Sequence, residues 1–171
     1  MEMKTRKSWR EKMDNPNLPK VVPVPPRMQK RFGVGTMLVP SPGDVEAYIR
    51  TVRKGRVTTV SQIREFLAGK YSANVTCPLT TGIFVWIAAE AAEEDANAGK
   101  TKITPYWRVL KDDGSLNPKF PGGIKRQEER LREEGHRIVP GKGKQPPRVA
   151  LSENVARALV RAASRLSRRL L

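Results

Sequence analysis

The sequence predicts a mainly α-helical domain flanked by basic arms, and three observations lead to this class. Apolar residues recur at helical spacing in four stretches of the central region, residues 32–138. The excess positive charge is concentrated at the two ends of the chain. Five prolines fall between residues 16 and 26, which favours an extended arm over a long helix there. A chain of 171 residues has the length of one domain with tails.

Four helices are expected in the central region, at 41–52, 60–70, 78–94 and 122–134. The first has Ser41 as its cap and Pro42 at its first helical position. Gly135 closes the last. An extended stretch at 103–110, followed by turn residues, predicts a small wing after Val109. Because short helices joined by tight turns are typical of helix-turn-helix proteins, we expect a winged helix-turn-helix.

The net charge is +16, and its distribution indicates the kind of partner. Residues 1–31 hold nine basic residues and three acidic ones, and residues 139–171 hold eight basic residues and one acidic residue. Thirteen of the sixteen excess charges therefore lie at the ends. Phosphate backbones favour such charge because binding releases counterions, and basic arms commonly supply it. We expect a polyanionic partner; the alternative is that the ends serve solubility or contact an acidic protein.

The two ends have different patterns. Residues 1–31 are expected to form a basic, Pro-rich arm, in which we expect Trp9 to dock on the core rather than stack on a base. Residues 139–150 are a linker, and residues 151–171 form a basic amphipathic helix. One face of that helix carries the arginines that we expect to contact phosphates, Arg157, Arg161 and Arg165. The alternative is a solvated helix that only covers apolar surface.

Composition excludes several classes of protein. No apolar run approaches the roughly 20 residues of a membrane-spanning helix, and the charged amino terminus does not resemble a signal peptide. Cys77 is the only cysteine, which excludes an internal disulfide and a cysteine-based zinc cluster. We expect no metal, no cofactor and a cytoplasmic location.

Several motifs in a fixed order resemble the DNA-binding domain of the O6-alkylguanine-DNA alkyltransferases. Residues 103–109 read ITPYWRV, where that family has Pro-Cys-His-Arg-Val. A turn with the glycine pair Gly122 and Gly123 follows, and then a helix ending in Glu-Gly. Upstream, residues 55–63 resemble the family's Gly-Val turn into the first helix of its helix-turn-helix. The resemblance covers residues 40–138, which are 99 of the 171 residues, and implies binding to duplex DNA.

The departures from the family's motif bear on catalysis. Tyr106 replaces the reactive cysteine and Trp107 replaces the histidine that relays the proton. The resemblance carries the family's arginine over to Arg108 and its orienting glutamate to Glu134. Because a phenol is mostly protonated at neutral pH and is a poor substitute for a thiolate, we expect no alkyl transfer and no enzyme. We expect Cys77 to be a packed apolar residue rather than a substitute nucleophile.

Tyr106, Trp107, Arg108 and Glu134 are the candidate residues of a lesion pocket. Two interpretations of Trp107 stay open. It either lines an open pocket and stacks on an extruded O6-alkylguanine, or it fills the cavity together with Tyr106. The chain resembles the alkyltransferase-like proteins, which lack the cysteine and bind the alkylated base without repairing it. Those proteins keep the histidine that is replaced here.

Duplex DNA is expected to contact the amino-terminal half of helix 78–94, the counterpart of a recognition helix. Four acidic residues of its other half would repel phosphates: Glu90, Glu93, Glu94 and Asp95. The candidate DNA-contacting residues of the domain are Thr59, Val60, Thr76, Leu79, Thr80 and Thr81. Leu79 or Thr80 takes the place of the family's intercalating arginine, and an apolar side chain there can wedge a base step.

The expected function is therefore a non-catalytic, alkyltransferase-like protein that recognises alkylated or distorted duplex DNA in repair. We expect a monomer associated with the nucleoid, with a repair protein as a further partner. Two alternatives stay open. One is a plain nucleic-acid-binding or protein-interaction module with a filled pocket. The other is an enzyme of another class, with Glu134 or Tyr106 as acid or base.

Overall fold

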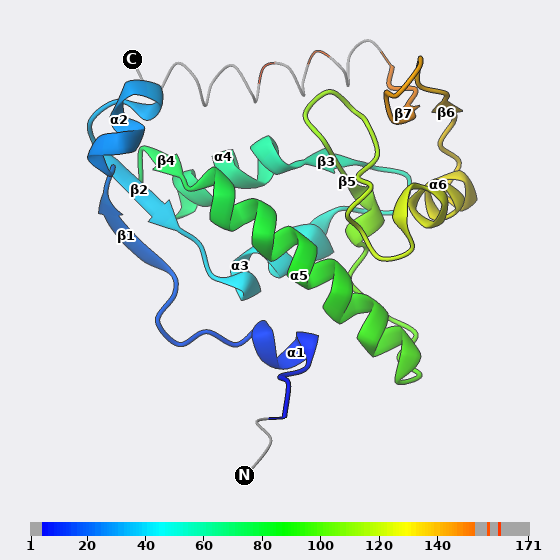
Figure 1. Cartoon of the computed structure of the whole chain (residues 1–171), viewed down its shortest axis with the longest axis horizontal. Helices are drawn as coiled ribbons and strands as arrows, with labels where there is room; N and C mark the ends of the chain where they lie inside the picture. The colour runs from blue at the N-terminus through cyan, green and yellow to red at the C-terminus, as the bar shows by residue number, and fades with distance from the viewer. Residues whose placement is uncertain (1–4, 153–156, 158–160, 162–171) are drawn as a thin grey trace.

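The structure is a computed structural model that describes residues 5–152, 157 and 161. In this part of the chain, six α-helices and three small sheets form a mixed α/β fold. Helices hold more of these residues than strands do, and the sheets are a β component that the prediction of a mainly α domain did not include. Helix α5 (Pro78–Asn97) crosses the middle of the molecule (Figure 1).

Helix α5 is central because small residues allow other elements to approach it closely. Alanine is the best helix former and adds little bulk, and four alanines of α5 are fully buried: Ala88, Ala89, Ala91 and Ala92. Helices α3 (Pro42–Thr51) and α4 (Val60–Lys70) pack against α5. Their buried residues Ile49, Ile63 and Leu67 belong to the same hydrophobic core.

The predicted starts of α3, α4 and α5 are confirmed. The Ser41 hydroxyl caps α3 by accepting a hydrogen bond from the Asp44 amide at 3.0 Å. Thr59 and Gln62 form a capping box at the start of α4. Helix α5 begins at Pro78 as predicted and continues to Asn97, three residues beyond the predicted end.

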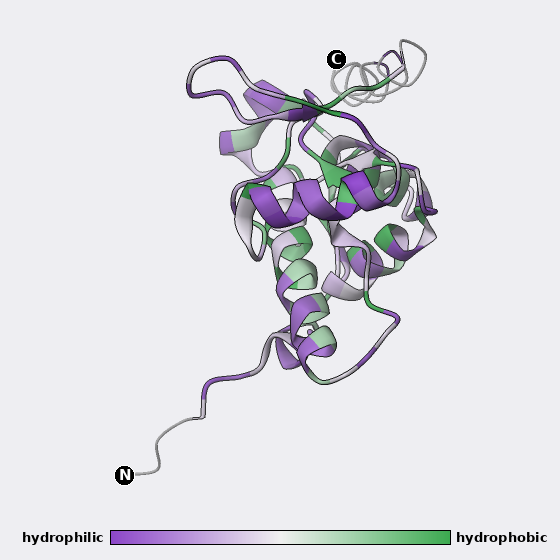
Figure 2. Cartoon of the chain, turned by 90° about the vertical axis from the view of Figure 1, so that its right-hand side faces the viewer, coloured by the Kyte–Doolittle hydropathy of each residue, from purple (hydrophilic) through white to green (hydrophobic). Residues whose placement is uncertain are grey.

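Helix α6 (Gly123–Glu133) follows a left-handed turn that favours glycine. Gly122 has a φ of 76°, and a Cβ at this position would lie 2.7 Å from the Cβ of Arg126. The helix buries Gln127 and Leu131. Its outer surface is hydrophilic (Figure 2).

Three small sheets tie distant parts of the chain together. In the largest, β1 (Lys20–Pro23) is antiparallel and β4 (Val75–Thr76) is parallel to the middle strand, β2 (Thr36–Val39). Strand β3 (Thr58–Thr59) pairs in parallel with β5 (Val109–Leu110) and so joins the start of α4 to the region of the predicted pocket. Because β4 lies between α4 and α5, these helices are not joined by the tight turn that we expected.

The amino-terminal segment, predicted as an arm, is packed on the domain. Helix α1 (Trp9–Lys12) lies against α5, where the Glu94 carboxylate accepts hydrogen bonds from the first two helical amides at 2.9 and 3.1 Å. The Trp9 ring meets the Trp86 ring edge-on, with centroids 4.9 Å apart. The expected docking of Trp9 is therefore confirmed.

The same segment continues with an edge strand and a short helix. Strand β1 pairs with β2, and helix α2 (Pro26–Phe32) buries Phe32 in a second hydrophobic cluster with Val24, Met37 and Val75. The arm prediction fails because proline favours extended backbone in an edge strand as much as in a free arm.

The predicted linker, residues 139–150, contains part of a hairpin. Strand β6 (Ile138–Val139) is antiparallel to β7 (Arg148–Val149), and Val149 is buried. Arg148 also forms a bridge with Ser115, which attaches the hairpin to the turn after β5.

Most of the predicted carboxy-terminal helix, residues 151–171, lies outside the described residues, and Arg165 is among these. Arg157 and Arg161 are helical and exposed. Within the described part of the chain, no helix is long and apolar enough to cross a membrane. Those same residues contain no group of three or more His, Cys, Asp or Glu side chains that could hold a metal ion.

Candidate functional site

Tyr106, a candidate residue of the expected pocket, is fully buried. It begins the 3-10 helix η1 (Tyr106–Arg108), and its ring packs edge-on against Trp107 and Phe120 at centroid distances of 5.5 and 5.3 Å. Its hydroxyl donates a 2.7 Å hydrogen bond to Glu93. Burial raises the pKa of the Tyr106 phenol, and the hydrogen bond to Glu93 raises it further. The phenol is therefore protonated and enclosed at neutral pH.

The Glu134 carboxylate accepts hydrogen bonds from three residues in two other parts of the chain. The Trp107 indole Nε1 donates to it at 3.0 Å and the Arg108 Nη2 at 2.7 Å. The Gly55 amide donates at 3.4 Å. Burial alone would raise the pKa of Glu134, but the hydrogen bonds from Arg108 and Trp107 outweigh it and lower the pKa. The structure thus brings these three residues together, yet an indole lacks an acceptor nitrogen and cannot relay a proton.

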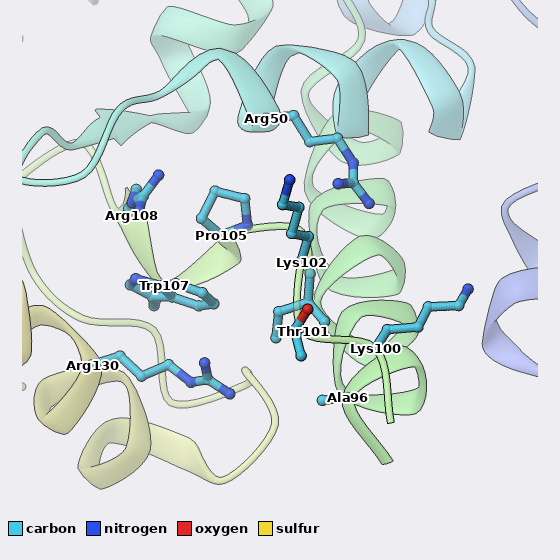
Figure 3. A pocket seen from close by; sticks show the side chains of 10 residues that line it. Arg50, Ala96, Lys100, Thr101, Lys102, Pro105, Trp107, Arg108 and Arg130 are labelled. Carbon is cyan, nitrogen blue, oxygen red and sulfur yellow. The ribbon is translucent and has the colours of Figure 1, made fainter. Parts of the chain in front are cut away.

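The four candidate pocket residues do not line one cavity. Trp107 and Arg108 line a pocket of about 550 Å³ at the carboxyl end of α5, whereas Tyr106 and Glu134 are not part of its lining (Figure 3). The remaining lining residues are Arg50, Ala96, Lys100, Thr101, Lys102, Ile103, Pro105 and Arg130. Both interpretations of this region therefore hold in part, because Tyr106 fills the interior while Trp107 borders an open pocket.

Trp107 is a wall of this pocket rather than a platform for a base. Its relative exposure is 9 %, and the Arg130 guanidinium lies over its ring at 4.4 Å from the centroid. A base that stacked on this face would have to displace Arg130 from its 2.7 Å ion pair with Glu93. Of the two interpretations of Trp107, stacking on an extruded base is therefore disfavoured by the geometry.

Three of the predicted DNA-contacting threonines are buried. The Thr59 hydroxyl accepts the Gln62 amide in the cap of α4. The hydroxyls of Thr76 and Thr81 donate to the carbonyls of Arg64 and Cys77 at 2.8 and 2.7 Å. These hydroxyls are buried and bonded within the fold, so they cannot reach DNA. Their burial could not be predicted, because a threonine has the same sequence signature on the surface and in the interior.

The other three predicted contacts differ in accessibility. Val60 is half-buried and packs against the core. The half-buried Thr80 donates its hydroxyl to the Cys77 sulfur at 2.9 Å, so Cys77 is a packed helix-start residue as expected. Leu79, by contrast, is 72 % exposed. Of the six predicted contacts within the domain, Leu79 is the best placed to meet a ligand.

A groove of about 390 Å³ runs beside Leu79 along the amino-terminal half of α5. Its lining residues are Pro78, Leu79, Gly82, Ile83, Trp86, Lys111, Asn117 and Lys119. Two lysines and no carboxylate are part of this lining. We name this feature the α5 groove. The exposure of Ile83 and Trp86 could not be predicted, because their spacing from Leu79, four and seven residues, is also that of a buried helix face.

Three of the four acidic residues near the carboxyl end of α5 have partners within the domain, which corrects part of the expected phosphate repulsion. Glu93 pairs with Arg130 and Asp95 pairs with Lys100 at 2.9 Å, so basic residues offset these two charges. Glu94 accepts hydrogen bonds from two amides of α1, and Glu90 has no ion pair within the described residues.

The α5 groove and the Trp107 pocket lie at opposite ends of one helix. Leu79 is near the start of α5 and Ala96, which lines the pocket, is near its end. At 1.5 Å per residue, this separation is about 25 Å. A base extruded beside Leu79 would thus not reach Trp107, so the two sites must act separately.

No protein-family model, curated protein or solved structure matches this chain.

Proposed function

We propose that the protein is a non-catalytic DNA-binding protein of the alkyltransferase-like type, which engages distorted or alkylated duplex DNA through the α5 groove. In this proposal the domain acts as a winged helix-turn-helix, with α4 and α5 as the helix pair and the segment after β5, joined to the β6–β7 hairpin, as the wing. The observation that carries the proposal is the exposed apolar row of α5 beside two lysines.

That row consists of three large side chains on one side of a helix. Leu79, Ile83 and Trp86 are 72 %, 43 % and 36 % exposed. Exposed apolar surface of this kind favours a bound partner, since burial contributes about 25 cal/mol for each Å² removed from water. An apolar side chain can enter a base step that is already weakened, and Leu79 is the most exposed of the three.

The charges around the groove favour a phosphate-bearing partner. Lys111 and Lys119 line the groove, and neither forms an ion pair within the described residues. Their ammonium groups are therefore available for the phosphates on either side of a wedged base step. The net charge of +16 favours the same class of partner.

The absence of alkyl transfer belongs to the same proposal. The buried Tyr106 phenol has a raised pKa. The Trp107 indole donates a hydrogen bond to Glu134 but has no nitrogen that could accept a proton. This cluster supports a structural role for η1 rather than a nucleophilic one.

A second candidate is a protein-interaction module, which the exposed apolar row also favours. The two candidates differ in what Leu79 contributes.

We expect Leu79→Ser to abolish a preference for duplexes with a mismatch or an O6-methylguanine over an intact duplex, in competition binding. Val34→Ser is the matched control, because Val34 is 87 % exposed and lies outside the α5 groove. A wild-type protein without any such preference would reject the proposal.

A further inference from the structure

The pocket beside Trp107 is lined by five cationic side chains and by no carboxylate. These cations are Arg50, Lys100, Lys102, Arg108 and Arg130. They come from α3, from the loop after α5, from η1 and from α6, and the Lys100 side chain points away from the other four (Figure 3). Residues from four separate parts of the chain thus bring positive charge to a single place.

The carboxylates behind the lining neutralise only part of this charge. Seven cations belong to the pocket and its ion pairs: the five lining residues, Arg10 and Arg126. Six of these cations share four carboxylates, those of Glu46, Glu93, Asp95 and Glu134. Three positive charges are therefore in excess. Lys102 has no ion pair within the described residues and is exposed.

The arginines of the pocket are held in place before any ligand arrives. Arg108 is hydrogen-bonded to Glu134 and to the Val52 carbonyl. Arg130 is fixed between its ion pair with Glu93 and the face of Trp107. A ligand would thus not have to order these side chains, which lowers the entropic cost of binding.

The remaining lining is mostly apolar and the size suits a small molecule. It consists of Ala96, Thr101, Ile103, Pro105 and Trp107. The volume of about 550 Å³ falls within the range of small-molecule sites. The apolar part of a ligand could contact Ile103 and Pro105 while an anion meets the cations.

We propose that this pocket binds the terminal phosphate of a nucleotide. A phosphomonoester carries between one and two negative charges at neutral pH, which matches the excess charge better than the single charge of a backbone phosphodiester. The nucleotide is either free or the phosphorylated end of a strand, and both present the same group. The pocket lies about 25 Å from Leu79 along α5, so this proposal does not depend on the α5 groove.

Calorimetric titration of the full chain with adenosine monophosphate and with adenosine tests the proposal at physiological salt. We expect the monophosphate to bind at least about tenfold more tightly than the nucleoside, and Lys102→Glu to weaken the monophosphate about tenfold. Lys20→Glu on β1 makes the same change of charge away from the pocket and should alter the affinity less than about twofold.

Trinucleotides with a 5′-phosphate and with a 5′-hydroxyl separate the two sources. Tighter binding of the phosphorylated trinucleotide than of free monophosphate assigns the site to a strand end, and the reverse order assigns it to a free nucleotide. Equal binding of adenosine and its monophosphate would overturn the proposal. Equal weakening by Lys102→Glu and Lys20→Glu would overturn it too, since binding would then follow net charge alone.

Discussion

The Tyr106 hydroxyl donates a 2.7 Å hydrogen bond to Glu93 in the interior of the domain. Burial and this bond raise the pKa of the phenol. We therefore predict that incubation with DNA containing O6-methylguanine adds no methyl group to the protein, as measured by intact-protein mass spectrometry. A methyl adduct on Tyr106, or on Cys77, would contradict the assignment of a non-catalytic protein.

Glu134 should make stability depend on pH. The pKa of Glu134 in the folded protein lies below its usual value of 4.5. The carboxylate therefore stabilises the folded protein at pH values above 4.5, and this stabilisation is lost as the pH falls through the lower folded-state pKa. We predict that Glu134→Gln lowers the free energy of unfolding by roughly 2 kcal/mol at pH 7 and by less near pH 3, in urea denaturation. Glu133→Gln, on the exposed side of α6, is the control. A difference that stays constant with pH would show that Glu134 does not act as a charge.

Trp9 should contribute to stability although it belongs to a segment that the sequence predicted to be an arm. Its ring contacts Trp86, and its amide is held by Glu94. Because the side chain is only half-buried, we predict a loss of about 2 kcal/mol for Trp9→Ala, below the range for fully buried tryptophan. Val34→Ala removes an exposed side chain and should change the free energy of unfolding by less than about 0.5 kcal/mol.

Gly122 provides a test of the turn before α6. Gly122 and Gly99 both have positive φ, of 76° and 87°, but only at Gly122 would a Cβ collide with another residue, Arg126. We predict that Gly122→Ala destabilises the protein by about 1 kcal/mol more than Gly99→Ala, measured by thermal unfolding. Equal losses would show that backbone conformation alone matters at this turn.

The positions of α3, α4 and α5 could be predicted from the sequence because local signals determine them, whereas α1 and α2 were missed. Ser41 and Thr59 act on amides three residues away, and Pro78 fixes the first turn of α5. The short strands could not be predicted. Strands β3, β4 and β5 have two residues each, which is too short for an alternating pattern, and their partners lie far away in the chain.

The candidate site was predictable only where the chemistry is local. Trp107, Arg108 and Glu134, which were predicted as neighbours, contact one another in the structure. Exposure was not predictable: Thr76 and Thr81 resemble surface residues in composition, but their hydroxyls are used by nearby carbonyls. The cationic pocket was missed because its lining residues come from four separate parts of the chain.

The most direct test of DNA binding through the α5 groove is the salt dependence of affinity for a short duplex, measured by fluorescence anisotropy. The variant Lys111→Glu/Lys119→Glu is compared with Lys20→Glu/Lys30→Glu, which makes the same change of net charge on β1 and α2. Each phosphate contact contributes a slope of about −0.9 in log affinity against log salt. We predict that the slope of the groove variant is less steep than that of the wild type by the contribution of about two contacts, while the control keeps the wild-type slope. Equal slopes in both variants would contradict the account.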